Sequence, residues 1–220
     1  MMAIDGKLIL ATKFGVRAQA LAISKQGLRR AAMVATMILA LATTHQLLGQ
    51  DTVVNLDPGQ TEISFTVGAT FHSVHGMFKL KTGTLRFDAT TGKATGLIVV
   101  DAVSGESGNR GRDRKMHKNI LESPQYPEIV FTPVRVQGHV NAEGESQVQV
   151  QGLIRLHGTE HQATMEAQVT VVGNRLNANT HFTIPYMEWG LKNPSTFMLR
   201  VSNQVQIDVR TTGRIVPRAR

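Results

Sequence analysis

Two pairs of histidines are the residues in this sequence best suited to bind a metal ion or to act as a base. His72 and His75 are three residues apart. On a strand such residues point to opposite faces, so their imidazoles cannot readily share an ion. His157 and His161 would share a face only on a helix, and Gly158 between them argues against one. We therefore expect structural roles for all four histidines, no metal and no cofactor, with an imidazole near the mouth of a barrel as the functional exception.

Ser107 is a candidate nucleophile because it lies in the sequence Gly105-Glu-Ser-Gly108. A serine of the G-x-S-x-G type needs a sharp turn between a strand and a helix, whereas this segment has the composition of an ordinary loop. The sequence holds no phosphate-binding P-loop and no paired-glycine dinucleotide motif. These patterns favour a binding protein over an enzyme.

Five cations crowd the segment that follows, namely Arg110, Arg112, Arg114, Lys115 and Lys118. The simplest interpretation is the solvated face of a short helix. The alternative is a clamp for the head group of a ligand, because arginine matches phosphate oxygens with paired hydrogen bonds. In that case Arg112 is a ligand-binding residue, unless a structural carboxylate holds it instead.

Residues 110–133 predict one short helix followed by a strand. Asp113 is a suitable N-cap, since its carboxylate can accept from the free amides of the first turn. Met116 and Ile120 lie four apart and share one helical face. Pro124 ends the helix, because the residue before a proline is forced out of the α region. A lone helix with an apolar underside is expected to lean over one end of a barrel, or to cover the edge of a sheet.

Strand patterns fill the rest of the chain after residue 50. In residues 61–67, Ile63, Phe65 and Val67 alternate with polar residues and are predicted to face inward. Residues 88–92 read as a hairpin turn, with Gly92 free to adopt a positive φ. Further strands are predicted over 71–80, 83–87, 96–101, 129–137, 147–156, 163–172, 177–185 and 197–210. Many strands with short connections indicate an all-β fold of roughly eight or more strands, either an antiparallel barrel or a sandwich. In an eight-stranded antiparallel barrel the scarcity of large aromatics would leave space inside, whereas a sandwich could pack the same residues tightly.

The chain has a formal net charge of +8, and this positive charge comes from its two ends. Residues 1–50 hold six Lys and Arg against one acidic residue, and residues 210–220 hold four Arg and no acidic residue. The intervening residues are close to neutral, so the basic face that nucleic-acid binding requires is not expected. There are no cysteines, which excludes disulfides and thiolate chemistry.

Residues 31–42 form an apolar run directly after Arg29 and Arg30. The run is too short for a membrane span but has the length and basic flank of a secretory signal peptide. Ala40 and Ala42 offer a cleavage site, and a cut before Asp51 is the alternative. We therefore expect a leader over residues 1–50, a barrel over 51–210 and a basic flexible tail over 211–220. The mature protein is expected in the periplasm or secreted, with no stable membrane span after cleavage.

Four segments taken together resemble one family. They are Phe71-His-Ser-Val-His-Gly-Met-Phe78, the helix of Arg112-Asp113 with Tyr126-Pro-Glu-Ile-Val-Phe131, Gly152-Leu-Ile-Arg-Leu-His-Gly-Thr159, and Trp189-Gly190 followed by Pro194. In order and spacing they look like the YceI-like family of periplasmic polyisoprenoid-binding proteins, over about residues 52–209. One segment departs from the pattern, since this chain has Glu160-His161-Gln162 where the family tends to carry Thr-Lys/Arg-Pro.

The resemblance implies a lipocalin-like barrel that holds an isoprenoid or fatty lipid in an apolar bore, without catalysis. Transport, storage or a stress response in the cell envelope are the corresponding functions, and a homodimer is left open. Two alternatives remain, namely a lipid-modifying enzyme with His72 or His157 as base, and an envelope protein whose filled barrel acts through a partner. The residues expected to contact the ligand are Ile63, Phe65, Val67, His72, Phe78, Leu85, Phe87, Arg112, Ile129, Phe131, Phe182 and Ile184.

Overall fold

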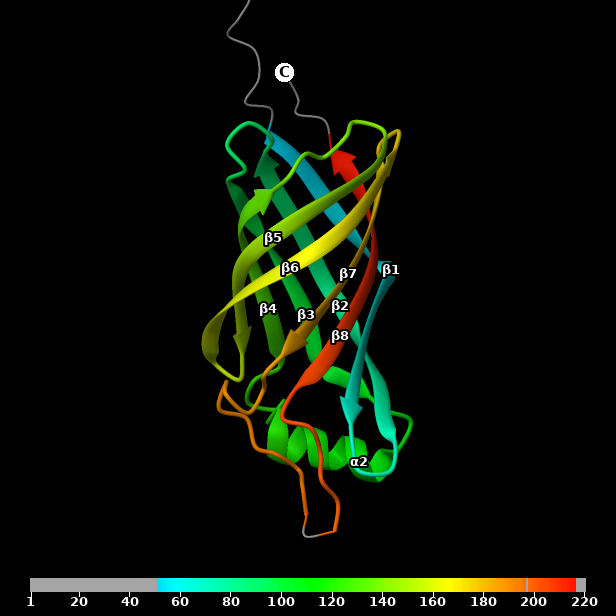
Figure 1. Cartoon of the computed structure of the whole chain (residues 1–220), viewed down its shortest axis with the longest axis vertical. Coiled ribbons are helices and arrows are strands. Elements are labelled where there is room, and N and C mark those ends of the chain that lie inside the picture. The colour runs from blue at the N-terminus through cyan, green and yellow to red at the C-terminus, as the bar shows by residue number, and fades with distance from the viewer. Residues whose placement is uncertain (1–50, 197, 217–220) are drawn as a thin grey trace, which may run out of the picture. The chain divides into compact units, whose positions relative to one another are not determined.

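Eight long strands close into an antiparallel barrel in the computed structural model, which describes residues 51–196 and 198–216. Each strand pairs with its neighbours in sequence, and the last strand pairs with the first, so the sheet has no free edge (Figure 1). The prediction of an all-β, eight-stranded antiparallel barrel with one short helix is confirmed. The strands are β1 (Asp51–Gly68), β2 (Ser73–Asp88), β3 (Ala94–Glu106), β4 (Glu128–Gln137), β5 (Gly144–Leu156), β6 (Thr159–Val172), β7 (Arg175–Ile184) and β8 (Val205–Val216).

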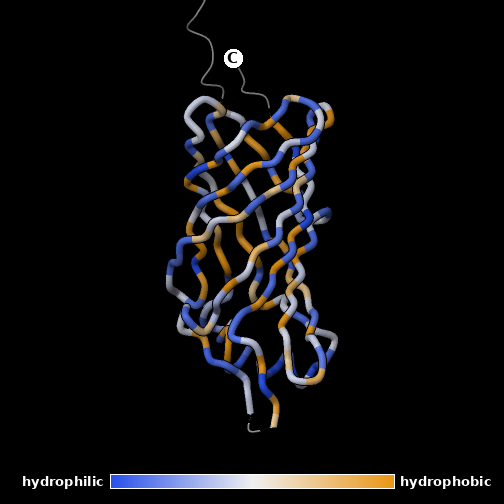
Figure 2. The backbone as a smooth tube through the Cα atoms, viewed as in Figure 1, coloured by the Kyte–Doolittle hydropathy of each residue, from blue (hydrophilic) through white to orange (hydrophobic). Residues whose placement is uncertain are grey.

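Apolar and polar residues alternate along these strands (Figure 2). Because successive side chains of a strand point to opposite faces, one set of positions lines the inside of the barrel, and this set is apolar. In β1 the alternation changes phase at residues 57–60, where the register with both neighbouring strands shifts. The amide of Gly59 donates to the Asp57 carboxylate at 2.8 Å. Because of this irregularity, Val54 faces inward before it and the odd-numbered Ile63 and Phe65 face inward after it.

Several strand boundaries differ from the predicted ones, and β8 begins at Val205 rather than at residue 197. Strand β8 continues to Val216, and its last residues pair with both β1 and β7. The flexible tail predicted from residue 211 was therefore wrong as far as residue 216, where Ile215 still follows the alternation of the strand. Strand β2 runs unbroken through a register shift between Leu80 and Thr82, where two separate strands were predicted. The predicted leader lies outside the described residues.

The helical segment between β3 and β4 consists of helix α2 (Arg110–Lys115) and a π-helical turn η2 (Met116–Ile120). Asn109 is the N-cap, and its side-chain oxygen accepts from the amides of Gly111 and Arg112 at 3.0 Å each. The prediction of Asp113 as the N-cap was wrong, because the helix begins one turn earlier. This segment lies across one end of the barrel, together with the β1–β2 hairpin and the long connection between β7 and β8 (Figure 1).

Within the described residues, no helix is both long and apolar enough to cross a bilayer. The buried apolar residues form two clusters. One surrounds Val54 and Val171, and the other surrounds Phe65 and Ile207 and includes the underside of the helical segment. The second cluster fixes the helical segment to the barrel and so positions the site described next.

Candidate functional site

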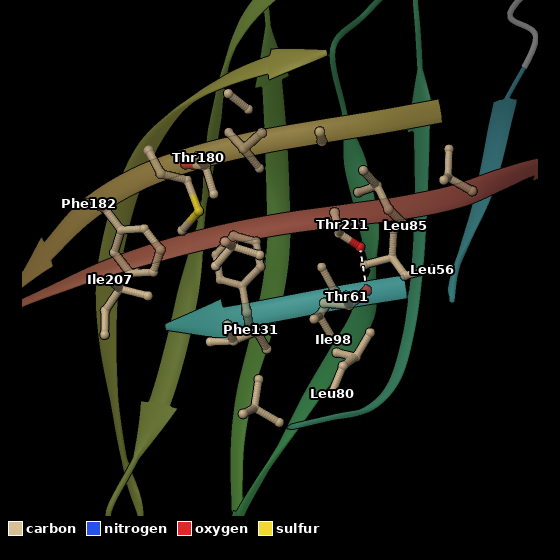
Figure 3. Close-up of a pocket in the computed structure, with 18 of the residues that line it drawn as sticks. Leu56, Thr61, Leu80, Leu85, Ile98, Phe131, Thr180, Phe182, Ile207 and Thr211 are labelled. Carbon is tan, nitrogen blue, oxygen red and sulfur yellow. Dashed lines mark hydrogen bonds between the residues drawn. The ribbon is translucent and has the colours of Figure 1, made fainter. Parts of the chain in front are cut away.

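A cavity of about 230 Å³ lies inside the barrel and is lined by inward side chains from all eight strands. Phe131 and Phe182 point into it from opposite sides (Figure 3). Eight of the residues expected to contact a ligand line this cavity, namely Ile63, Phe78, Leu85, Phe87, Ile129, Phe131, Phe182 and Ile184. That they bind a ligand stays a prediction, but their common position around one apolar bore is a feature of the structure.

A second cavity, of about 150 Å³, lies beneath the helical segment. The remaining two apolar residues of the predicted set, Phe65 and Val67, line it from β1. Met116 and Ile120 line it from the helical segment, which confirms that this segment leans over one end of the barrel. The two cavities are neighbours because they share four lining residues, Phe78, Ile129, Ile184 and Ile207.

Charged side chains are absent from the lining of both cavities among the described residues. The polar groups that do line them have partners within the protein. The Thr61 hydroxyl lies 2.7 Å from both the Asp57 carbonyl and the Thr211 hydroxyl, and Thr180 donates to the Glu166 carbonyl at 2.6 Å. A hydrocarbon chain in these cavities would therefore leave no buried polar group without a partner.

Tyr186 is the residue with a polar side-chain group among those that line the second cavity. It donates to the Ser202 carbonyl at 2.6 Å, so this hydroxyl also has a partner within the protein. Burial raises the pKa of Tyr186, which keeps the phenol neutral at physiological pH.

His117 fastens the helical segment to the barrel through both ring nitrogens. Nε2 lies 2.8 Å from the Gly105 carbonyl, and Nδ1 lies 2.8 Å from the hydroxyl of Ser123, which is only 1% exposed. A carbonyl can only accept, so Nε2 carries the proton and, in the neutral ring, Nδ1 accepts from the hydroxyl. Gly105 packs closely against a neighbouring side chain, because a Cβ there would lie 2.4 Å from the Phe78 ring. This arrangement was missed from the sequence, because no regular spacing links Gly105, His117 and Ser123.

Arg112 is held on the outside of the helical segment by a serine. Its Nε donates to the Ser107 hydroxyl and its Nη2 to the Ser107 carbonyl, each at 2.7 Å. The Asp113 carboxylate accepts from the amide of Ser107 at 2.9 Å and also from its hydroxyl. Arg112 therefore has a structural partner, as the more conservative interpretation required, although that partner is a serine rather than a carboxylate. Arg114 and Lys115 are exposed.

The histidines lie outside the lining of both cavities. His72 is exposed in the turn between β1 and β2, so the structure does not bring it together with the other predicted ligand contacts. The Nδ1 atom of His75 lies 2.9 Å from the Thr66 hydroxyl. His157 adopts a positive φ of 53° and its Nε2 lies 3.1 Å from the Glu122 carboxylate. His161 stacks flat on Trp189, with ring centroids 4.3 Å apart.

Glu122 joins the end of the helical segment to two other parts of the chain. Its carboxylate accepts from Lys192 at 3.1 Å and lies 3.1 Å from His157. These hydrogen bonds, that from Lys192 foremost, lower the pKa of Glu122 below its ordinary value of 4.5. A lowered pKa stabilises the folded state above the unfolded pKa, and this contribution is lost as the pH falls through the folded value.

We therefore expect Glu122→Gln to lower the free energy of unfolding at neutral pH, and the loss relative to wild type to shrink below pH 4.5. Urea unfolding followed by circular dichroism at neutral pH and near pH 3 measures both differences. Glu160→Gln is the matched control, because Glu160 is an exposed glutamate on the barrel wall. An equal loss at both pH values would contradict the assignment.

Much of the cavity wall was missed from the sequence. No residue of β5 or β6 was predicted, and the missed residues on β5, β6 and β7 include Val148, Val150, Ile154, Met165, Ala167, Val169, Leu176 and Ala178. Their alternation at every second position was a usable signal. In contrast, Leu191, Pro194 and Val201 line the second cavity from the irregular β7–β8 connection, where no periodicity marks inward positions.

Comparison with known families and structures agrees with this fold. A family model described as the YceI-like domain matches residues 55–213. No curated protein matches the sequence. Among solved structures, BcnA of Burkholderia cenocepacia has a TM-score of 0.59 at 14% identity, covering 71% of this chain and 98% of that one.

Two further structures have the same fold. A polyisoprenoid binding domain of Saccharophagus degradans, implicated in plant cell wall breakdown, has a TM-score of 0.54 at 16% identity, covering 74% of this chain and 98% of that one. The YCEI protein of Campylobacter jejuni has a TM-score of 0.55 at 13% identity, covering 68% and 88%. The match of the family model to most of the barrel, together with the four segments that resemble the family, shows that this chain belongs to the YceI-like family.

Proposed function

We propose that this protein binds the tail of an isoprenoid or another long-chain lipid inside the barrel, without chemically changing it. The observation that carries the proposal is the bore itself, which is lined by apolar side chains from every strand and by no charged group. The polyisoprenoid binding domain of Saccharophagus degradans, which has a similar fold, supports the choice of ligand class.

Burial of the tail supplies the affinity in this proposal. Each CH₂ group removed from water contributes roughly 0.8 kcal/mol, so a long chain needs few polar contacts. The head group remains outside the two cavities, because no charged residue or unpaired polar residue of the described part of the chain lines them to receive it. A carrier of this kind fits transport, storage or a stress response in the cell envelope, and its dimerisation remains to be measured.

Native mass spectrometry before and after extraction with organic solvent tests the proposal. We expect a bound mass that disappears on extraction, and an extracted lipid whose structure equals that of the lipid supplied. Protein that never carries a lipid when offered polyprenols or fatty acids would contradict binding. A lipid recovered in altered form would contradict the absence of catalysis.

Export with cleavage is a second part of the proposal, and it rests on the basic and then apolar pattern of residues 29–42. N-terminal sequencing of the protein from its native host should give a start between Thr43 and Thr52. A cut before Asp51 removes nothing from β1, which begins at that residue. An intact N-terminus on protein from the cytoplasm would contradict export.

The cations of the helical segment are proposed to contact the head group of the ligand if it carries phosphate. Arg112 is already bonded to Ser107, so the exposed Arg114 would contribute more of this contact. We expect tighter binding of a phosphorylated polyprenol than of the free alcohol, and loss of the preference in Arg112→Ala/Arg114→Ala. The preference should also fall at 1 M salt, where the screening length is about 3 Å. Equal affinity of the wild type for both ligands would contradict the clamp.

A further inference from the structure

Two exposed apolar side chains lie at the end of the barrel covered by the helical segment. Phe71, in the turn between β1 and β2, is 82% exposed, and Met198, in the connection between β7 and β8, is also 82% exposed. They are the most exposed large apolar side chains among the described residues. Neither lines a cavity, so the proposed lipid binding does not account for them.

The two segments that carry these side chains are joined to each other, although they are far apart in sequence. The amide of Thr70 donates to the Arg200 carbonyl at 3.0 Å, and the amide of Arg200 donates to the Thr70 hydroxyl at 2.9 Å. A β-bridge between Ala69 and Val201 continues the pairing. Phe71 and Met198 therefore belong to one structural unit, which we name the paired loops (residues 69–73 and 194–202, without 197).

The paired loops and the helical segment carry more basic than acidic residues. Arg200 is an exposed residue of the loops themselves. Residues 110–120 at the same end of the barrel hold five Lys and Arg and a single acidic residue (Figure 1). That acidic residue, Asp113, is bonded to Ser107. Exposed Arg110, Arg114 and Lys118 consequently have no carboxylate on their own segment to neutralise them.

The second cavity lies directly behind the paired loops, because Pro194 and Val201 of the loops line it. Exposed apolar side chains flanked by cations bind the interface of an anionic bilayer. The apolar side chains enter the headgroup region, and the cations contact phosphates. A protein partner is a poorer fit, since a stable interface buries about 800 Å² on each side, far more than two isolated side chains provide.

We propose that the paired loops dock this protein on an anionic lipid surface. Phe71 and Met198 insert among the head groups, Arg200 and the cations of the helical segment contact phosphates, and the second cavity then faces the bilayer. This docking goes beyond the proposed function, because it requires no lipid tail in the barrel.

A single fluorescent probe can test the docking, because the chain has no cysteine. Met198→Cys in the full chain, labelled with the polarity-sensitive dye NBD, should shift its emission to the blue when phosphatidylglycerol-containing vesicles are added. Vesicles of phosphatidylcholine alone, or high salt with the anionic vesicles, should give a smaller shift. In the labelled protein, Phe71→Ser should weaken partitioning into the vesicles by roughly tenfold, as expected when an aromatic side chain no longer leaves water.

Val172→Cys is the matched control, since Val172 is 63% exposed at the opposite end of the barrel. It should show no shift, because docking through the paired loops leaves this end of the barrel in water. An equal shift at both positions, or none at position 198 when the protein sediments with anionic vesicles, would overturn the proposal. A blue shift at position 198 that grows with protein concentration in the absence of vesicles would also overturn the proposal. It would show that the paired loops bind a second copy of the protein instead of a lipid surface. Native mass spectrometry measures the lipid bound in the barrel separately. Failure of tail binding can therefore be distinguished from failure of docking.

Discussion

Phe182→Glu should abolish co-purification of lipid with this protein. Phe182 lines the bore from β7 (Figure 3). Among the described residues, none that lines the bore is charged. An unpaired carboxylate buried at this position costs several kcal/mol, and if it stays ionised it draws water into the space that a lipid tail would fill. Native mass spectrometry measures the bound lipid, and circular dichroism on the same samples measures the folded fraction.

Thr183→Glu is the matched control, because Thr183 is the next residue of the same strand and is exposed on the outside of the barrel. It should fold and carry lipid as the wild type does. Phe65→Arg applies the same test to the second cavity. A folded Phe182→Glu protein that carries the normal amount of lipid would mean that the ligand does not occupy the bore.

The wall of the barrel could be predicted from the sequence because a strand has a period of two residues. In β1, Ile63 and Phe65 alternate with polar residues, and one face of a strand must be buried when a sheet closes on itself. The same rule placed Phe182 and Ile184 on the inside. The number of strands and their short connections indicated antiparallel pairing but left a barrel and a sandwich open, and the resemblance to the YceI-like family favoured the closed barrel.

The end of the barrel could not be predicted in the same way, because its contacts follow no regular spacing along the sequence. The bonds of His117 to Gly105 and Ser123 depend on how the helical segment lies over β3. The capping role given to Asp113 belongs to Asn109, since either residue type can cap a helix and only the observed start of the helix decides. His72 was assigned to the site from its neighbourhood in sequence, yet it lies exposed in a turn.

The β8 boundary illustrates a different limit. Residues 211–216 combine Thr, Gly and Arg with two apolar residues, a composition that resembles a tail as much as a strand. These residues form part of strand β8 because they pair with both β1 and β7. A glycine is required at position 213 because a Cβ there would lie 2.6 Å from the Val54 side chain.

Ala178→Trp should empty the barrel of lipid while leaving it folded. Ala178 faces the bore from β7, and the cavity of about 230 Å³ beside it can take up the indole ring. Adding a large side chain to a tightly packed core costs about 1–3 kcal/mol, and the space already present reduces that cost. The ring then occupies the volume that the tail needs, so bound lipid should fall at least tenfold with little change in the melting temperature.

Asn179→Trp provides the control on the outer surface of the same strand, where residue 179 is exposed. Because the chain has one native tryptophan, Trp189, the emission of the added residue can be followed in both variants. It should be blue-shifted at position 178, in the dry bore, and red-shifted at position 179, in water. A folded Ala178→Trp protein with blue-shifted emission and undiminished lipid would show that the tail binds elsewhere. Loss of lipid in Ala178→Trp, together with normal lipid content in Asn179→Trp, would show that the tail occupies the bore. This pair of variants introduces no buried charge.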